Sequence, residues 1–185
     1  MEVDFSKGAT PWEVTIRLLV AVLVGGVIGW DRQRSDKPAG LRTHMLVALG
    51  AAAFTLLGFE VGSHLSPHGG AGFDPTRVLQ GVVGGIGFLG AGVIIQDRGH
   101  VSGITTAASV WVSGALGSAA GVGAFVLAGI ATLFTLLILV VARLEGLHRA
   151  SHPRPAPEDE RHAAHGPAPA NGPAPANGRT PANAP

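Results

Sequence analysis

The sequence predicts an all-α membrane protein, a bundle of five transmembrane helices followed by a disordered tail. Charged residues make up only 14% of the 185 residues and apolar residues 46%, whereas soluble domains carry roughly 25% charge. Several uncharged runs reach the roughly 20 residues that a helix needs to cross a bilayer. Six glycines lie within residues 81–92. Each interior glycine costs about 0.5–1 kcal/mol relative to alanine, so this pattern favours helices packed closely in lipid.

Five segments have the length of a bilayer crossing, and together they define a transmembrane domain over residues 1–149. Their predicted limits are 11–30, 41–59, 78–96, 102–121 and 122–142. The first begins with Thr10, Pro11 and Glu13, a capping-box pattern with proline at the first helical position. The third follows Asp74, an acidic cap. The last two form one uncharged run of about two crossings, which we divide at the Gly-Val-Gly turn of residues 121–123.

The placement of lysine and arginine predicts the orientation. Eight basic residues fall on one side of the predicted bundle and three on the other, so the positive-inside rule places the N-terminus outside and the C-terminus inside. The inner set is Arg32, Arg34, Lys37, Arg42, Arg98, Arg143, Arg149 and Arg154, and the outer set is Lys7, Arg17 and Arg77. On the outer side, Glu13 and Arg17 are spaced four apart and predict a helix-surface pair.

Residues 150–185 differ in composition from the rest of the chain. Nine of the 13 prolines lie there, and the hexapeptide GPAPAN occurs twice in tandem. A segment rich in proline, alanine, glycine and asparagine offers too little apolar surface to offset the entropy of ordering. We expect a disordered cytoplasmic tail.

The third span predicts a face for helix packing. On a helical wheel, Val82, Ile86, Leu89 and Val93 form a bulky stripe, which we assign to lipid. The small residues are then expected to meet neighbouring helices, with Phe88 turned inward. Replacing Gly85 or Gly87 with leucine should disrupt such a bundle, and Val82→Leu should be mild. The alternative is a helix that can shift or line a narrow path. The expected packing residues are Gly81, Gly84, Gly85, Gly87, Gly90, Gly92 and, within the fourth span, Trp111.

Hydroxyl side chains share one face of the fourth predicted span. Ser102, Thr106, Ser109 and Ser113 follow the spacing i, i+4, i+7 and i+11. In a membrane, such groups bond to neighbouring helices or to the carbonyl four residues earlier. We expect them to hold helices together. A polar lining for protons or a hydrated cation is the alternative.

The first loop is the densest polar segment near the predicted membrane, and it supplies the main site hypothesis. Ionisable groups at membrane depth are costly and usually have partners, so we expect Asp31 to pair with Arg32 or Arg42. A simple topology determinant is the alternative. Magnesium binds through one or two carboxylates and keeps several waters, which makes Asp31 a candidate for weak Mg²⁺ contact. We expect no other cofactor.

Two broad function classes are not expected from the sequence. The chain has no Walker motif, no paired metal-binding histidines on one helix and no nucleophile elbow, so we do not expect an enzyme. Its net charge of +1 gives no electrostatic footprint for nucleic acid.

Four strings together resemble the MgtC/SapB family of bacterial inner-membrane proteins. They are KPAGLRTHMLV at 37–47, DPTRV at 74–78, GIGFLGAGVI at 85–94 and VSGITTAASVW at 101–111. The resemblance covers roughly residues 14–142. It implies a multi-pass protein of the bacterial inner membrane that supports magnesium homeostasis or stress adaptation. The implied functional residues are Asp31, Arg32, Gly40, Arg42, Thr43, Asp74, Arg77, Gly85, Gly87, Gly90, Gly92, Thr105, Thr106 and Trp111.

Two departures from the family pattern affect these expectations. Asp31 stands where the family often has glutamate, so the carboxylate has a shorter reach. We also expect no folded C-terminal regulatory domain of the kind that virulence-linked members carry.

Two functions follow from these observations. The first is an accessory protein that modulates another membrane protein, with the lipid bilayer and a membrane-protein partner or a second copy as its contacts. The second is a small magnesium or proton transporter or channel, with Asp31, Arg42, Thr106 and Ser109 along the route.

Overall fold

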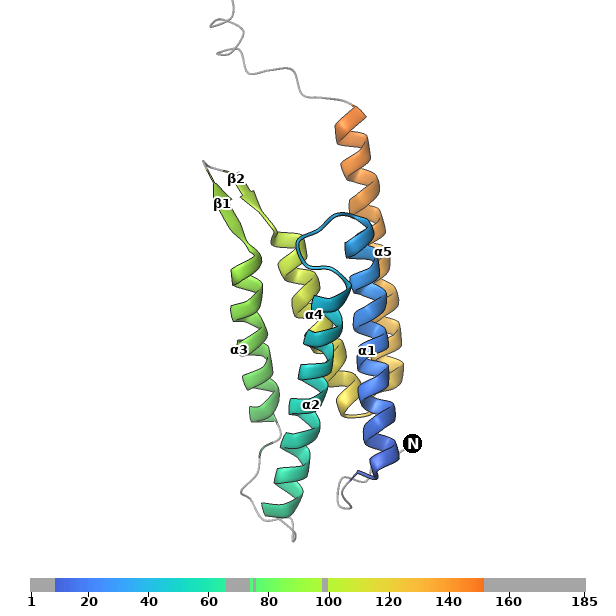
Figure 1. The fold of residues 1–185 in the computed structure, drawn as a ribbon, viewed down its shortest axis with the longest axis vertical. Coiled ribbons are helices and arrows are strands. Elements are labelled where there is room, and N and C mark those ends of the chain that lie inside the picture. Colours follow the sequence, from blue (N-terminus) through green and yellow to red (C-terminus); the bar gives the residue numbers. More distant parts are fainter. Residues whose placement is uncertain (1–8, 66–73, 75, 98–99, 152–185) are drawn as a thin grey trace, which may run out of the picture. The chain divides into compact units, whose positions relative to one another are not determined.

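The computed structural model describes residues 9–65, 74, 76–97 and 100–151. The chain divides into two units, Met1–Glu145 and Gly146–Pro185, and the packing below concerns the first. The elements run in the order α1 (Pro11–Arg34), α2 (Leu41–Leu65), α3 (Thr76–Val93), β1 (Ile95–Asp97), β2 (His100–Ser102), α4 (Ile104–Gly121) and α5 (Phe125–Ser151) (Figure 1). The predicted all-α class is confirmed. Residues 152–185 of the predicted tail lie outside the described residues.

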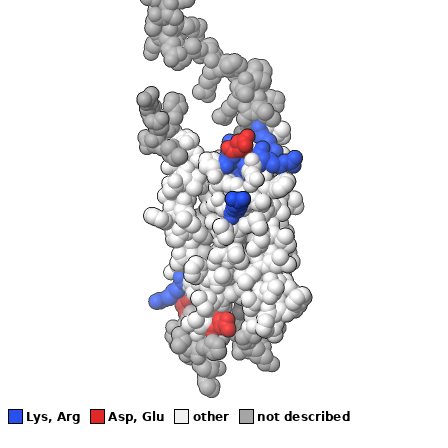
Figure 2. Space-filling model, in the orientation of Figure 1, with Lys and Arg blue, Asp and Glu red and all other residues white. Residues whose placement is uncertain are grey.

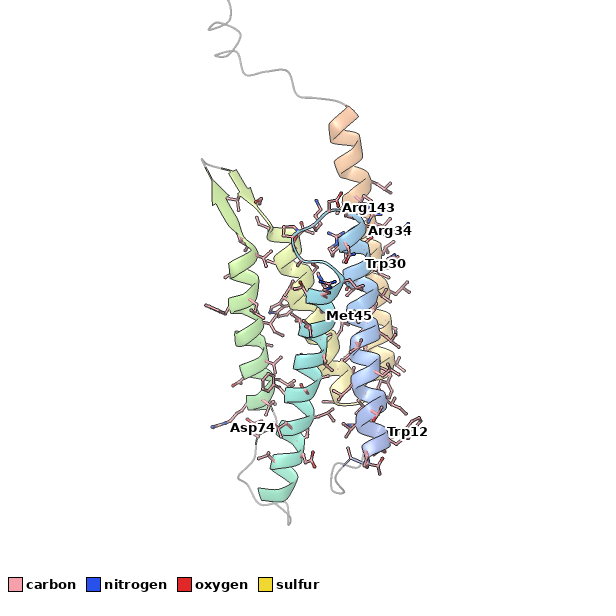
Figure 3. The ribbon with its side chains drawn as sticks, in the orientation of Figure 1. Trp12, Trp30, Arg34, Met45, Asp74 and Arg143 are labelled. Atoms are coloured by element: carbon pink, nitrogen blue, oxygen red, sulfur yellow. The ribbon has the colours of Figure 1, made fainter. Side chains whose placement is uncertain are left out.

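Four of the described helices are long and apolar enough to cross a membrane. They are α1, residues Leu41–Gly62 of α2, α3, and residues Phe125–Leu144 of α5. Trp12 and Trp30 are exposed near opposite ends of α1 (Figure 3), about 27 Å apart at 1.5 Å per residue, which suits the two interfaces of a bilayer. Figure 2 shows charged side chains mainly near the two ends and a largely uncharged surface between them. α4 is not among the four, so five crossings and their orientation stay predictions.

The segment between α3 and α4 differs from the prediction. β1 and β2 pair antiparallel, with Ile95 opposite Ser102, so α3 ends before residue 96 and Ser102 lies in a strand instead of on the hydroxyl face of α4. Gly103 follows with a φ of 88°, a left-handed conformation that glycine adopts without steric cost. The predicted limits of these two spans are drawn from uncharged runs of sequence, and an uncharged run can continue from a helix into a strand. The predicted turn at residues 121–123 is confirmed, because α4 ends at Gly121 and Gly123 has a φ of 84°.

α1 and α4 both approach the backbone of α2, and glycines make this possible. A Cβ added at Gly25 would lie 2.6 Å from the His44 carbonyl oxygen, and one at Gly29 would lie 2.7 Å from the Leu41 Cα. A Cβ at Gly117 would overlap the Ala48 carbonyl oxygen and lie 2.7 Å from its Cα. Helices in lipid associate through such close van der Waals contacts. α1, α2 and α4 therefore form the tightly packed centre of the bundle.

The face assignment of α3 is wrong. Ile86 is buried, and Val82 packs on the same cluster as Ala51 and Val110. Phe88 and Trp111, expected inside, are 80% and 46% exposed. A helical wheel shows which residues share a face, but it does not show which face meets the bundle. α3 reaches α4 with a bulky side chain instead: the Ile86 Cδ1 occupies the space where Gly114 lacks a Cβ.

The predicted packing glycines of α3 mostly point away from the described bundle. A Cβ added at five of them would meet nothing within 4 Å, and these five are exposed: Gly81, Gly84, Gly85, Gly87 and Gly92. Gly90 is buried, and its Cβ would lie 3.7 Å from the Ala107 carbonyl oxygen. The expected damage from Gly85→Leu and Gly87→Leu therefore has no steric basis within the described part of the chain.

Polar contacts fix several helix ends. The capping box predicted at Thr10 is confirmed, since its N–H donates to the Glu13 carboxylate at 2.8 Å and its hydroxyl accepts from the Glu13 N–H at 3.4 Å. Arg17 does not pair with Glu13. It donates instead to the Gly121 carbonyl oxygen at 3.1 Å, where a cation stabilises the C-terminal end of α4. α1 is thereby joined to the end of α4.

Asp74 caps α3 as predicted, and it gives that end a pH dependence. It accepts from the Thr76 hydroxyl at 2.6 Å and the Thr76 N–H at 2.9 Å. These bonds, the hydroxyl first, and the charge of Arg77 hold the pKa of Asp74 below its ordinary value of 3.8. The stabilisation is therefore present above pH 3.8 and is lost as the pH falls through the lower folded-state pKa.

Asp74→Asn should consequently remove the stabilisation that the ionised Asp74 carboxylate gives to this end of α3. We expect thermal unfolding in detergent to distinguish the variant from the wild type near neutral pH and to show the two converging in strong acid. A difference that grows on acidification would contradict this account.

Candidate functional site

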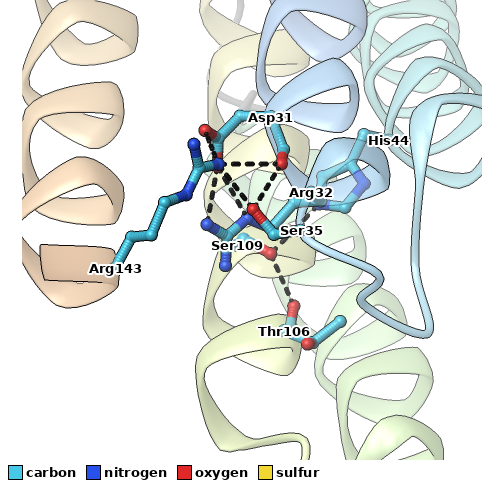
Figure 4. Close-up of polar contacts among 7 residues, drawn as sticks. All are labelled: Asp31, Arg32, Ser35, His44, Thr106, Ser109 and Arg143. Atoms are coloured by element: carbon cyan, nitrogen blue, oxygen red, sulfur yellow. Dashed lines mark hydrogen bonds and ion pairs between the residues drawn. The ribbon is translucent and has the colours of Figure 1, made fainter. Parts of the chain in front are cut away.

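Asp31 lies at the centre of a polar cluster where α1 meets α5 (Figure 4). Its Oδ2 accepts from the Arg32 Nη2 at 2.6 Å and from its Nε at 3.1 Å. Its Oδ1 accepts from the Arg143 Nη2 at 2.6 Å. Arg143 also donates to Ser35 Oγ, while the Ser35 hydroxyl donates to the Asp31 carbonyl at 2.9 Å. We call Asp31, Arg32, Ser35 and Arg143 the Asp31 cluster, and this side of the molecule the Asp31 end.

The Asp31 cluster is partly buried and carries a net positive charge. The side chains of Arg32, Asp31 and Arg143 are 4%, 13% and 42% exposed. One carboxylate therefore balances two guanidinium groups, and both of its oxygens are engaged. A Mg²⁺ ion at Asp31 would approach two guanidinium groups, whose positive charges repel it. The described residues contain no group of three or more His, Cys, Asp or Glu side chains placed to hold a metal.

The structure separates the residues of the predicted polar cluster. Of the two expected partners of Asp31, Arg32 is confirmed and Arg42 is not in contact. Arg42 and Thr43 are exposed on the first turn of α2, and Thr105 is exposed on α4, whereas Thr106 is buried. Asp74 lies at the opposite end of the bundle from Arg143 (Figure 3), and Arg77 follows it on α3.

Sequence reasoning missed Arg143 as a partner of Asp31. The two residues are 112 positions apart, and pairing over such a distance leaves no local pattern. The available signal was topological, because alternating spans place Arg143 on the same side of the membrane as the first loop.

A second polar network lies deeper, between α2 and α4. His44 is fully buried. Its Nδ1 lies 2.8 Å from the Gly40 carbonyl oxygen, and its Nε2 lies 3.0 Å from Ser109 Oγ. Since a carbonyl only accepts, Nδ1 is assigned the proton, which leaves Nε2 of the neutral ring as an acceptor for the Ser109 hydroxyl when that hydroxyl turns toward it. Gly25 and Gly29 of α1 leave the room that this residue needs.

The hydroxyl face of α4 is confirmed for three of its four predicted members. Thr106, Ser109 and Ser113 are buried. The Ser109 hydroxyl also lies 2.8 Å from the Thr106 carbonyl oxygen (Figure 4), and the Ser113 hydroxyl donates to the Ser109 carbonyl at 3.0 Å. The single Ser109 proton can serve either His44 or the Thr106 carbonyl. Ser109 thus joins α2 and α4 through one hydroxyl group.

Ser109→Ala should destabilise the bundle by about 1–3 kcal/mol, because it leaves a buried ring nitrogen of His44 without a partner. Thermal unfolding of the purified full chain in detergent measures the loss. Thr105→Ala, an exposed hydroxyl deletion on the same helix, is the matched control and should have little effect. Equal losses in both variants would show that the His44 contact does not stabilise the fold.

Comparison with known proteins places these residues in a family. The profile of the MgtC family matches residues 18–147, which include the Asp31 cluster and the His44 network. Protein SrpB of Synechococcus elongatus is 44% identical over 138 residues, covering 68% of this chain and 72% of SrpB. No solved structure matches the chain significantly.

Two further relatives carry magnesium-related or family names. The putative magnesium transporter YhiD of Escherichia coli K12 is 40% identical over 129 residues, covering 70% of this chain and 60% of YhiD. Protein MgtC of Brucella abortus is 42% identical over 123 residues, covering 66% of this chain and 48% of MgtC. The chain thus matches only about half to three fifths of the length of these two relatives. The profile match and the four apolar helices together identify the chain as a multi-pass bacterial membrane protein of the MgtC family.

Proposed function

We propose that the chain supports magnesium homeostasis or stress adaptation as an accessory protein that modulates another membrane protein. The observation that carries this proposal is the engagement of Asp31 by two arginines. A carboxylate held in this way stabilises a junction between α1 and α5, and each of its oxygens already accepts a hydrogen bond from an arginine. The family membership and the name of the YhiD relative support the link to magnesium.

The buried hydroxyls in the spans also support an accessory role. Thr55, Ser113 and Thr132 each donate to the carbonyl four residues earlier in their own helix, at 2.7, 3.0 and 2.6 Å. Such bonds satisfy the hydroxyl donors within each helix, so these groups are accounted for by the packing of the fold. Mg²⁺ dehydrates reluctantly, which makes a route through these helices costly.

Growth of a deletion strain in low magnesium tests the proposal. We expect impaired growth, rescue by the full chain, and co-purification of a membrane protein with the tagged chain. Arg143→Gln, made at equal protein level, should reduce rescue if the junction of α1 and α5 shapes the partner's binding surface. Parental growth of the deletion strain together with the absence of a partner would refute the proposal.

A small magnesium or proton transporter is the second candidate, and the His44 network favours it. His44 can exchange a proton, and it touches the hydroxyl of Ser109 across two helices. Purified protein in liposomes should then pass protons or magnesium, and Ser109→Ala should slow the flux. Zero flux under both gradients, with a growth defect still present, would leave the accessory role as the better account.

We further propose five crossings with the N-terminus outside and the C-terminus inside. The proposal requires α4 to cross the membrane as well. Its small and hydroxyl residues suit a helix that is enclosed by other helices. Reporter fusions after Trp30 and after Ala142 should report the same, cytoplasmic side. Opposite sides would show that one of the four intervening segments does not cross.

A further inference from the structure

An apolar groove of about 760 Å³ lies between α2 and α3. This volume falls within the range of ligand pockets. The groove exists because α3 contacts α4 through Ile86 while its glycines leave space beside α2. Residues that line it include Leu46, Gly50 and Phe54 from α2 and Gly81, Gly85 and Leu89 from α3. A Cβ at any of these three glycines would meet nothing within 4 Å.

The groove narrows where α2 and α3 approach each other. There a Cβ at Gly58 would lie 2.8 Å from Val78 Cγ1, so the two helices touch, and they diverge toward the Asp31 end (Figure 1). From Leu46 to Val61 the α2 lining of the groove runs about 22 Å at 1.5 Å per residue. One leaflet of the hydrocarbon core is about 15 Å thick. The groove is thus longer than one leaflet and shorter than the whole hydrocarbon core of about 30 Å. Because it narrows away from the Asp31 end, it suits an acyl chain that enters from that end better than a spanning helix.

Arg42 marks the open end of the groove. It lies one helical turn before Leu46 on the same face of α2, and it is exposed. It makes no hydrogen bond or ion pair with the described residues. The contact between Gly29 and Leu41 places it on the membrane side of Asp31. An arginine at this depth needs an anionic partner, and a guanidinium binds phosphate oxygens through paired hydrogen bonds.

We propose that the groove binds one acyl chain of a phospholipid from the leaflet at the Asp31 end, with the lipid phosphate on Arg42. Anionic phospholipids are preferred there. Residues 31–42 at this end carry four basic side chains and two acidic ones, and such clusters attract anionic lipids. The basic residues are Arg32, Arg34, Lys37 and Arg42, and the acidic residues are Asp31 and Asp36.

The first experiment measures lipid retention. The full chain, purified from membranes and equilibrated with phosphatidylglycerol or phosphatidylethanolamine, is examined by native mass spectrometry. We expect phosphatidylglycerol to be retained in preference. Gly85→Leu and Gly50→Leu, which fill the groove from opposite walls, should each weaken binding about tenfold, equivalent to about 1.4 kcal/mol. Gly87→Leu is the matched control, because it adds the same side chain to the same helix outside the groove.

Arg42→Gln tests the headgroup contact, with Arg34→Gln as its control on α1. We expect Arg42→Gln to reduce the preference for phosphatidylglycerol about tenfold and Arg34→Gln to leave it largely unchanged. Thermal unfolding without added lipid distinguishes lost binding from lost folding. Equal retention by the groove-filling variants and Gly87→Leu, or equal effects of the two arginine substitutions, would overturn the proposal.

A second copy of the chain is the competing occupant. The sequence contains no cysteine, so Gly85→Cys introduces a single reactive thiol. Disulfide-linked dimers formed in the membrane would place another α3 at the groove and overturn the lipid assignment. Labelling of the α2 and α3 walls by phosphatidylglycerol with a photoactivatable acyl chain, without dimers, would support it.

Discussion

Gly117→Ala should destabilise the bundle by about 3 kcal/mol, a large loss for the addition of one methyl group. The new Cβ would overlap the Ala48 carbonyl oxygen and lie 2.7 Å from the Ala48 Cα. Both are backbone atoms, and they cannot rotate aside as a side chain can. The central contact between α2 and α4 would have to open. Thermal unfolding of the purified chain in detergent measures the loss.

Two other glycines provide graded controls. At Gly114 the added methyl would meet the Ile86 Cδ1, the end of a flexible side chain, so Gly114→Ala should cost less. At Gly87 it would meet nothing within 4 Å, and Gly87→Ala should be neutral or slightly stabilising because alanine favours a helix. The expected order of loss is therefore Gly117, Gly114, Gly87. Equal stability of all three variants would contradict the close packing of α2 and α4.

Asp31→Ala should have the second large effect, a loss of about 3–5 kcal/mol, the range for removing one partner of a buried ion pair. The Arg32 side chain is 4% exposed and hydrogen bonds to Asp31 through two nitrogen atoms. Without the carboxylate, its charge would remain buried and unpaired. Arg143 would also lose its tie to α1.

Three companion variants separate these contributions. Arg143→Gln should cost no more than about 1 kcal/mol, because that side chain is 42% exposed and water screens the pair. Arg32→Met should be milder than Asp31→Ala, and adding it to Asp31→Ala should recover part of the stability, since no unpaired buried charge remains. A double substitution as unstable as the sum of the two singles would show that the pair is not coupled.

Features set by neighbouring residues were predictable from the sequence. The capping box at Thr10, the Asp74 cap, the turn at Gly123 and the pairing of Asp31 with Arg32 each depend on groups within four positions. The buried hydroxyls of α4 were predictable because helical periodicity places them on one face. Ser102 was the exception, since β1 and β2 end the periodicity before it.

The features that the sequence did not predict depend on which helices, and which faces of them, pack together. Nothing local says whether Ile86 or Gly85 of α3 meets α4, because both faces of that helix are apolar and lipid accepts either. Arg143 and Ser109 find their partners across 112 and 65 positions. The close contact of Gly117 with α2 was missed for a related reason: glycines were most conspicuous in α3, whereas the tightest contacts lie in α4 and α1.

α1 is held near both of its ends by contacts with α4 and α5, and these contacts limit how the bundle can move. At one end Arg17 binds the Gly121 carbonyl, and at the other Asp31 binds Arg143. A rocking motion of α1 against these helices would stretch one of the two charged contacts, whichever way it tilts. α3 has no such pair of anchors among the described residues, and it meets α4 through Ile86. We therefore expect α3 to move more easily than α1, and a conformational change of the bundle should begin with a displacement of α3.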